Sequence, residues 1–155
     1  MEQIINVYTD GSCHPQTRAG CWGAYIFIDG HKTILHSIVQ DTTHNRMELM
    51  AVIEAVDFIR SRQIENQRIN IHTDSQYVVN IEKRYDKLRL KNFLTKNGTP
   101  VQNSDLVQTL IKQIDSCSLH FIKVKGHEKN TETRNYNREV DMFVRKMLRE
   151  YLRNI

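Results

Sequence analysis

The amino-acid sequence predicts a single α/β domain: a mixed five-stranded sheet with helices on both faces. The first forty residues hold three apolar, β-branched segments, and an Asp-Gly pair between the second and third is typical of a hairpin. Further along, segments with helical periodicity alternate with two short strand-like segments, a pattern typical of parallel strands joined by helices. A length of 155 residues suits one domain with its own core.

Each element is predicted from its apolar pattern and from the turn or capping residues that bound it. Three strands are predicted first, over residues 3–9, 21–28 and 32–39, followed by a helix (45–62), a strand (69–73) and a helix (76–81). A basic segment without clear periodicity (82–103) comes next. A helix (105–116), a strand (119–124) and a last helix (136–153) complete the order. The first three strands form the antiparallel part of the sheet, and the other two are expected to be parallel. A turn at Asp10 should end the first strand. Asn45 should cap the first helix, and Glu48 could complete a capping box.

Composition and charge set broad limits on partners and location. The formal charge of +4 and the pI of about 9.0 are compatible with a polyanionic partner. The three cysteines are an odd number without a Cys-x-x-Cys pair, which argues against a disulfide framework or a zinc site and favours a reducing compartment. The amino terminus lacks a signal-peptide pattern, and no apolar run is long enough to span a membrane. We expect a cytoplasmic monomer that is not bound to a membrane.

Two acids follow predicted strands in matching contexts, Thr-Asp-Gly-Ser at Asp10 and Thr-Asp-Ser-Gln at Asp74. If these strands are parallel neighbours, both carboxylates lie in the crevice where open α/β sheets bind ligands. Each acid alone could equally be an ordinary turn or cap residue. Glu48 has the same two interpretations, helix capping or metal ligation.

A third position, Asp141, lies among apolar residues of the last predicted helix, where an unpaired carboxylate is costly. Four carboxylates without a cysteine cluster suit a hard cation such as Mg²⁺ or Mn²⁺. Such a site matches metal-assisted phosphodiester hydrolysis. His127 follows a glycine near the end of the last strand, where it could transfer a proton or be a plain surface histidine.

Five motifs occur in a fixed order along nearly the whole chain: Y-T-D-G-S-C, T-T-H-N-R-M-E-L-M-A, T-D-S-Q-Y-V, V-K-G-H and N-x-x-x-D. Together they resemble the successive motifs of type 1 ribonuclease H. The resemblance implies the ribonuclease H-like fold over residues 1–155. It also implies endonucleolytic cleavage of the RNA strand of RNA–DNA hybrids, leaving 5′-phosphate and 3′-hydroxyl ends.

The resemblance also implies roles for individual residues. The family's metal-binding carboxylates, which hold two Mg²⁺ ions that Mn²⁺ could replace, match Asp10, Glu48, Asp74 and Asp141. The loop histidine thought to assist proton transfer matches His127. Positions where the family contacts the RNA backbone and 2′-hydroxyls match Cys13, His44, Asn45 and Gln76. The pocket for a DNA phosphate matches Thr43. No small-molecule cofactor is expected.

Two basic segments receive different interpretations. Within the basic insert, the segment from Lys83 to Lys96 is the candidate grip on the DNA strand, through Lys87, Arg89 and Lys91, with a solvated loop as the alternative. The basic residues of the last helix (Arg145, Lys146, Arg149 and Arg153) are interpreted as a solvated face.

Three other functions are weighed against hydrolysis of hybrids. A haloacid dehalogenase phosphatase needs an aspartate nucleophile where this chain has Tyr8, so that hypothesis fails. A transposase or integrase core places its glutamate on a late helix, whereas Glu48 lies on an early one. A hybrid-binding module without catalysis is disfavoured by the presence of all four acids, but it stays open.

Overall fold

The computed structural model describes residues 2–125 and 135–155. Its elements, in chain order, are β1 (Gln3–Cys13), β2 (Gly20–Ile28), β3 (His31–Val39), α1 (His44–Ser61), β4 (Gln67–Thr73), α2 (Gln76–Lys83), α3 (Tyr85–Leu90), α4 (Ser104–Ser116), β5 (Leu119–Lys123) and α5 (Tyr136–Arg153). This order confirms the predicted one, with α3 as an addition.

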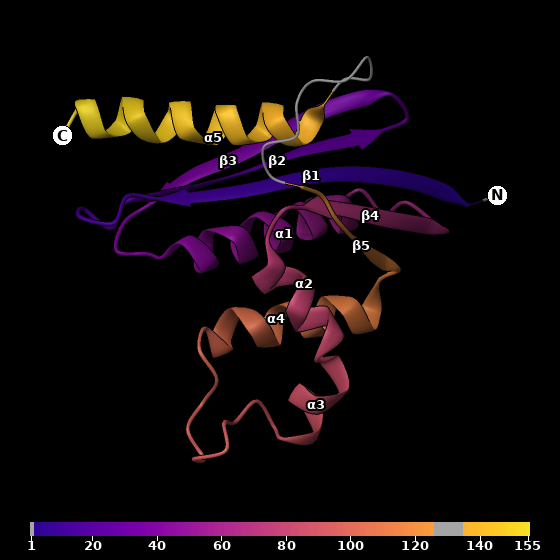
Figure 1. Ribbon diagram of the computed structural model, residues 1–155. Helices are drawn as coiled ribbons and strands as arrows, with labels where there is room; N and C mark the ends of the chain where they lie inside the picture. Colours follow the sequence, from indigo (N-terminus) through magenta and orange to yellow (C-terminus); the bar gives the residue numbers. More distant parts are fainter. Residues whose placement is uncertain (1, 126–134) are drawn as a thin grey trace.

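The five strands form one mixed sheet in the order β3-β2-β1-β4-β5. β2 pairs antiparallel with β1 and β3, whereas β4 pairs parallel with β1 and β5. Figure 1 shows α5 along one face of the sheet and α1 along the other, with α2, α3 and α4 beyond α1. The predicted mixed sheet with helices on both faces is confirmed.

Alternating side chains along the strands supply two hydrophobic cores, one on each face of the sheet. On β1, Ile5 and Val7 pack in the core that includes α1, while Tyr8 packs in the core that includes Val140 and Val144 of α5. One helix, α1 or α5, therefore packs on each face of the central strand β1. Within the described residues, no helix is long and apolar enough to cross a membrane.

The first strand does not stop at Asp10 as predicted. β1 continues to Cys13 because its last residues stay paired with β2, from Asp10 opposite Gly23 to Cys13 opposite Gly20. The parallel pairing with β4, in contrast, ends at Tyr8 opposite His72. Asp10 therefore lies inside a paired strand on one side and beyond the end of β4 on the other.

The cap predicted for the first helix was also wrong. Thr43 is the N-cap of α1, and its hydroxyl accepts a hydrogen bond from the backbone N–H of Arg46 at 3.2 Å. Asn45 lies inside the first turn instead. Glu48 is not part of a capping box with Asn45, because its side chain is buried with only 1% exposed.

The basic insert has more structure than its sequence predicted. Leu88 is only 4% exposed and packs with the main core, as do the flanking Tyr85 and Phe93. This packing, rather than a clear sequence period, stabilises the six-residue helix α3. A turn lies at Gly98, whose left-handed φ of 80° favours glycine.

Candidate active site

Three acids meet where β4 ends. Asp10 comes from β1, Glu48 from α1, and Asp74 follows β4 directly. One carboxylate oxygen from each lies within 4.8 Å of the other two. Because Tyr8 is opposite His72 in the parallel pairing, Asp10 and Asp74 are each two residues further along their chains. Asp10 and Asp74, which share the Thr-Asp context, therefore lie at equivalent positions along β1 and just after β4.

Two glycines let both helices approach Asp10 closely. A Cβ on Gly11 would lie 2.6 Å from the backbone nitrogen of Glu48, so only glycine allows α1 to sit this near β1. On the other face, a Cβ on Gly23 would lie 2.7 Å from a methyl group of Val144 on α5. Gly23 is also the partner of Asp10 in the β1–β2 pairing. Side chains from α1 and α5 can therefore both approach Asp10.

Asp141 reaches this point from α5. It lines the same cavity as the other three acids, and its side chain is within hydrogen-bonding range of Asp10. The carboxylate is 29% exposed and accepts a hydrogen bond from Nε of Arg145, one turn later, at 3.1 Å. α5 begins after Asn135, whose side-chain oxygen accepts a hydrogen bond from the backbone N–H of Arg138 at 3.0 Å.

The electrostatics of the cluster favour a bound cation. Burial raises the pKa of Asp10, and the charge of Glu48 raises it further. Burial also raises the pKa of Glu48, followed by the charge of Asp74. Oε2 of Glu48 is buried without a hydrogen-bond partner among the described residues. An all-oxygen donor set with an unpartnered buried oxygen suits a hard divalent ion.

The acids form the floor of an open cavity of about 690 Å³. Its rim contains three of the residues expected to contact RNA, namely His44, Asn45 and Gln76. Nε2 of His44 lies 3.3 Å from Oε1 of Glu48, one helical turn away. Other residues that line the cavity, none of them predicted as site residues, include Ser12, Tyr77, Asn135, Asn137, Arg138, Met142 and Arg145.

This architecture matches known proteins along nearly the whole chain. The family model for RNase H matches residues 2–149. The chain belongs to the ribonuclease H family. Ribonuclease H of Bartonella tribocorum is 35% identical over 157 residues, covering 99% of this chain and 94% of that one. Ribonuclease H of Chlorobaculum parvum is 35% identical over 152 residues, covering 97% and 99%.

Solved structures show the same fold at lower identity. The structure of LC9-RNase H1, a type 1 RNase H with the type 2 active-site motif, has a TM-score of 0.78 and 22% identity, covering 94% of this chain and 72% of that one. A foamy viral protease-reverse transcriptase in complex with dsDNA has a TM-score of 0.70 and 15% identity, covering 93% and 92%. The fold of this chain is therefore ribonuclease H-like.

Membership of the ribonuclease H family has three consequences for the chain. It is a nuclease enzyme, as the matches to ribonucleases H indicate. The family implies endoribonuclease activity on RNA–DNA hybrids. It also implies dependence on a divalent metal, for which the acid cluster provides oxygen ligands.

The other expected site residues that the structure describes do not line this cavity. Cys13 directs its thiol to the backbone oxygen of Thr42 at 3.4 Å, and Thr43 caps α1. In the insert, Lys87 and Lys91 are exposed at a second, smaller cavity of about 210 Å³. His127 lies outside the described residues.

The observed surroundings of Arg89 and Arg145 differ from those expected from the sequence. The guanidinium of Arg89 is ion-paired with Asp115 of α4, so this cation is already partnered within the protein. Arg145 was interpreted as part of a solvated face; its side chain is 56% exposed, but it also lines the cavity and pairs with Asp141. The spacing of four residues between an acid and an arginine on one helix was the signal for this pair.

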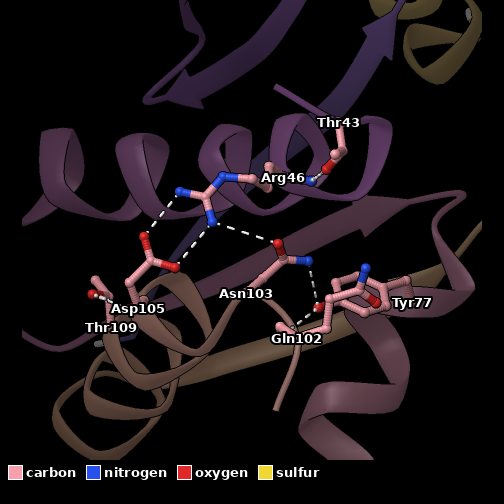
Figure 2. Close-up of polar contacts among 7 residues, drawn as sticks. All are labelled: Thr43, Arg46, Tyr77, Gln102, Asn103, Asp105 and Thr109. Carbon is pink, nitrogen blue, oxygen red and sulfur yellow. Dashed lines mark hydrogen bonds and ion pairs between the residues drawn. The ribbon is translucent and has the colours of Figure 1, made fainter. Parts of the chain in front are cut away.

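A polar network fixes the end of the insert against the helices that border the site (Figure 2). Arg46 donates from both terminal nitrogens to the carboxylate of Asp105, and from one of them to the side-chain oxygen of Asn103 at 3.4 Å. The amide of Asn103 donates to the hydroxyl of Tyr77 at 3.0 Å. Tyr77 in turn donates to the backbone oxygen of Gln102.

Proposed function

We propose that residues 1–155 form a single catalytic domain that hydrolyses the RNA strand of RNA–DNA hybrids by two-metal-ion catalysis. The products carry 5′-phosphate and 3′-hydroxyl ends. The observation that carries the proposal is the meeting of three carboxylates within 4.8 Å at the floor of an open cavity, in a chain of the ribonuclease H family. The enzyme acts as a monomer in the cytoplasm, without a small-molecule cofactor.

The metal ligands in this proposal are Asp10, Glu48, Asp74 and Asp141. The unpartnered buried oxygen of Glu48 and the raised carboxyl pKa values support the fit of a hard cation, Mg²⁺ with Mn²⁺ as a substitute. Two such ions, when bound, activate the attacking water and stabilise the leaving oxygen of an in-line displacement. The four carboxylates hold the ions and leave the open side of the cavity to the substrate.

The RNA strand is bound along the cavity rim. His44 and Asn45 lie in the first turn of α1, and Gln76 begins α2. Side chains and free backbone N–H groups at two helix starts are suited to phosphate and 2′-hydroxyl oxygens. Cys13 contributes a contact beside this rim. In this arrangement the 2′-hydroxyl contacts distinguish RNA from DNA.

The DNA strand is bound through its phosphates. Thr43, at the start of α1, contacts one phosphate, and the insert contacts others through Lys87, Arg89 and Lys91. The exposure of Lys87 and Lys91 around one small cavity supports this role, whereas the pairing of Arg89 with Asp115 limits its share. His127 transfers a proton during hydrolysis.

Labelled RNA–DNA, RNA–RNA and DNA–DNA duplexes and single-stranded RNA, each incubated with and without EDTA, test the proposal. We expect cleavage of the RNA strand of the hybrid alone, and none in EDTA. Cleavage that persists in EDTA, or equal activity on single-stranded RNA, contradicts it.

Asp10→Asn separates catalysis from binding. The neutral variant should bind the hybrid but not cleave it, because the amide keeps the shape of the side chain and removes the charge that the cations need. A binding-only module would instead show no cleavage in the wild-type protein. Loss of the folded state in Asp10→Asn would mean that this acid has a structural role.

A further inference from the structure

Arg145 is a cation held at the rim of the acid cluster. It lies one helical turn after Asp141 on α5, and its Nε donates to Oδ1 of that acid at 3.1 Å. The side chain lines the 690 Å³ cavity while remaining 56% exposed. It therefore contacts one of the carboxylates and also borders the space that a substrate would occupy.

The rotation of α5 keeps Arg145 at this position. Val140, Val144 and Leu148 are buried against the sheet, so the helix cannot turn about its axis without exposing them. Arg138 and Arg145 both line the cavity, and they are seven residues, or about two turns, apart on α5. Arg149, in contrast, is exposed and is not part of the rim.

The guanidinium of Arg145 has donors to spare. Arginine carries five N–H groups in a planar fork. The pair with Asp141 uses Nε, and within the described parts of the chain the two terminal nitrogens have no hydrogen bond or ion pair. Those nitrogens are therefore available to a second anion, for which a phosphate diester has the matching geometry.

We propose that Arg145 competes with divalent cations for Asp141 and moves to a phosphate of the hybrid when cations occupy the carboxylates. This inference rests on the proposed function and adds a residue to it. The same carboxylate cannot satisfy both a guanidinium and a divalent cation fully, and the two positive charges repel each other. Once it is released from Asp141, Arg145 can bind a substrate phosphate through its guanidinium, next to the acids whose charge the bound cations neutralise.

Mg²⁺ affinity in the absence of substrate tests the first half of the exchange. Isothermal titration calorimetry of Arg145→Gln should show Mg²⁺ binding about fivefold tighter than in the wild-type protein, because a competing cation has been removed. Arg149→Gln, one turn further along α5, is the matched control and should bind Mg²⁺ as the wild type does. Arg145→Lys keeps the charge and should also stay near the wild-type affinity. Unchanged or weaker Mg²⁺ binding by Arg145→Gln overturns the proposal.

Steady-state hydrolysis at saturating Mg²⁺ tests the second half. Arg145→Gln should raise KM for the hybrid by at least about threefold, because the variant cannot form a charge-assisted hydrogen bond to phosphate, while kcat changes much less. Arg145→Lys should restore part of the affinity. A KM equal to that of Arg149→Gln overturns the transfer of Arg145 to substrate.

The two measurements also separate this inference from the proposed function. If the wild-type protein does not cleave hybrids at all, the function is wrong. The Mg²⁺ titrations need no substrate, so they still decide whether Arg145 competes for Asp141.

Discussion

Arg46 on α1 binds both carboxylate oxygens of Asp105 on α4, with a distance of 2.9 Å in each hydrogen bond. Two parallel hydrogen bonds define the orientation of the pair as well as its distance. Through Asn103, the same arginine connects the end of the basic insert to Tyr77, which lies at the cavity rim. The insert and the starts of α1 and α2 are therefore held relative to one another by polar contacts.

The Arg46–Asp105 pair predicts an acid-dependent part of the folding stability. Hydrogen bonding to Arg46 lowers the pKa of Asp105 from 3.8 to about 2. A lowered carboxyl pKa stabilises the folded state above the ordinary pKa, and this contribution disappears as the pH falls from about 4 through 2. Because Asp105 is largely exposed, solvent limits the contribution to about 0.5–1 kcal/mol.

Urea unfolding of Asp105→Asn checks this expectation. The variant should be less stable than the wild type at pH 6, and the difference should shrink toward pH 2.5. Asp41→Asn is a suitable control, because its partner Arg18 forms a more exposed pair with one hydrogen-bonding distance of 3.0 Å. A stability difference that is the same at both pH values argues against the titration of Asp105 as its source.

Glu48→Gln should retain the fold and abolish metal-dependent activity. The amide keeps the size of the side chain, and it removes a buried charge whose pKa is already raised by burial, so the metal-free variant should be at least as stable as the wild type. The hydrolysis rate should fall by at least about 100-fold, since even residues that only support metal ligands cost up to that much when changed.

Glu54→Gln is the matched control for Glu48→Gln, because Glu54 lies on the same helix and is exposed. Thermal unfolding with and without Mg²⁺ supplies a second measurement. Stabilisation by Mg²⁺ should be present in Glu54→Gln and reduced in Glu48→Gln. Equal stabilisation of both variants would remove Glu48 from the metal ligands.

Thr43→Ala should act mainly on folding. Thr43 caps α1, and removal of a cap costs about 1 kcal/mol of unfolding free energy. Thr43→Ser keeps the capping oxygen and should restore most of the stability. Hybrid binding, measured under conditions where each variant is folded, then reports the phosphate contact: a KM unchanged in Thr43→Ala would mean that the residue only caps the helix.

The two cations of α3 should respond differently to substitution. Lys87→Glu should weaken hybrid binding and flatten its salt dependence, with a change of roughly one in the slope of log K against log salt for each phosphate that the variant no longer binds. Arg89→Gln should instead lower the stability of the insert, because Asp115 is left without its ion-pair partner. Binding isotherms at several salt concentrations check this. A slope that stays constant in Lys87→Glu is incompatible with phosphate binding there.

The sequence predicted the order of strands and helices along the chain, because their periodicity is a local signal, and the matching Thr-Asp contexts indicated that Asp10 and Asp74 lie close together. It did not predict that β1 continues through Asp10, since the extension depends on pairing with β2 at Gly23. The cap at Thr43 and the helix around Leu88 were missed for a related reason: each is decided by neighbours distant in the sequence or by one hydrogen bond. Arg145 was missed because its role depends on how α5 is rotated.

Gly11 and Gly23 have a consequence for the acid cluster that extends beyond the two positions themselves. The separation between the carboxylates of Glu48, Asp10 and Asp141 depends on how closely α1 and α5 pack against β1 and β2 at these two glycines. Truncating Val144, which has no ligand oxygen in its side chain but packs on Gly23, should therefore change metal affinity without altering a carboxylate. The spacing of these carboxylates is a property of the hydrophobic core.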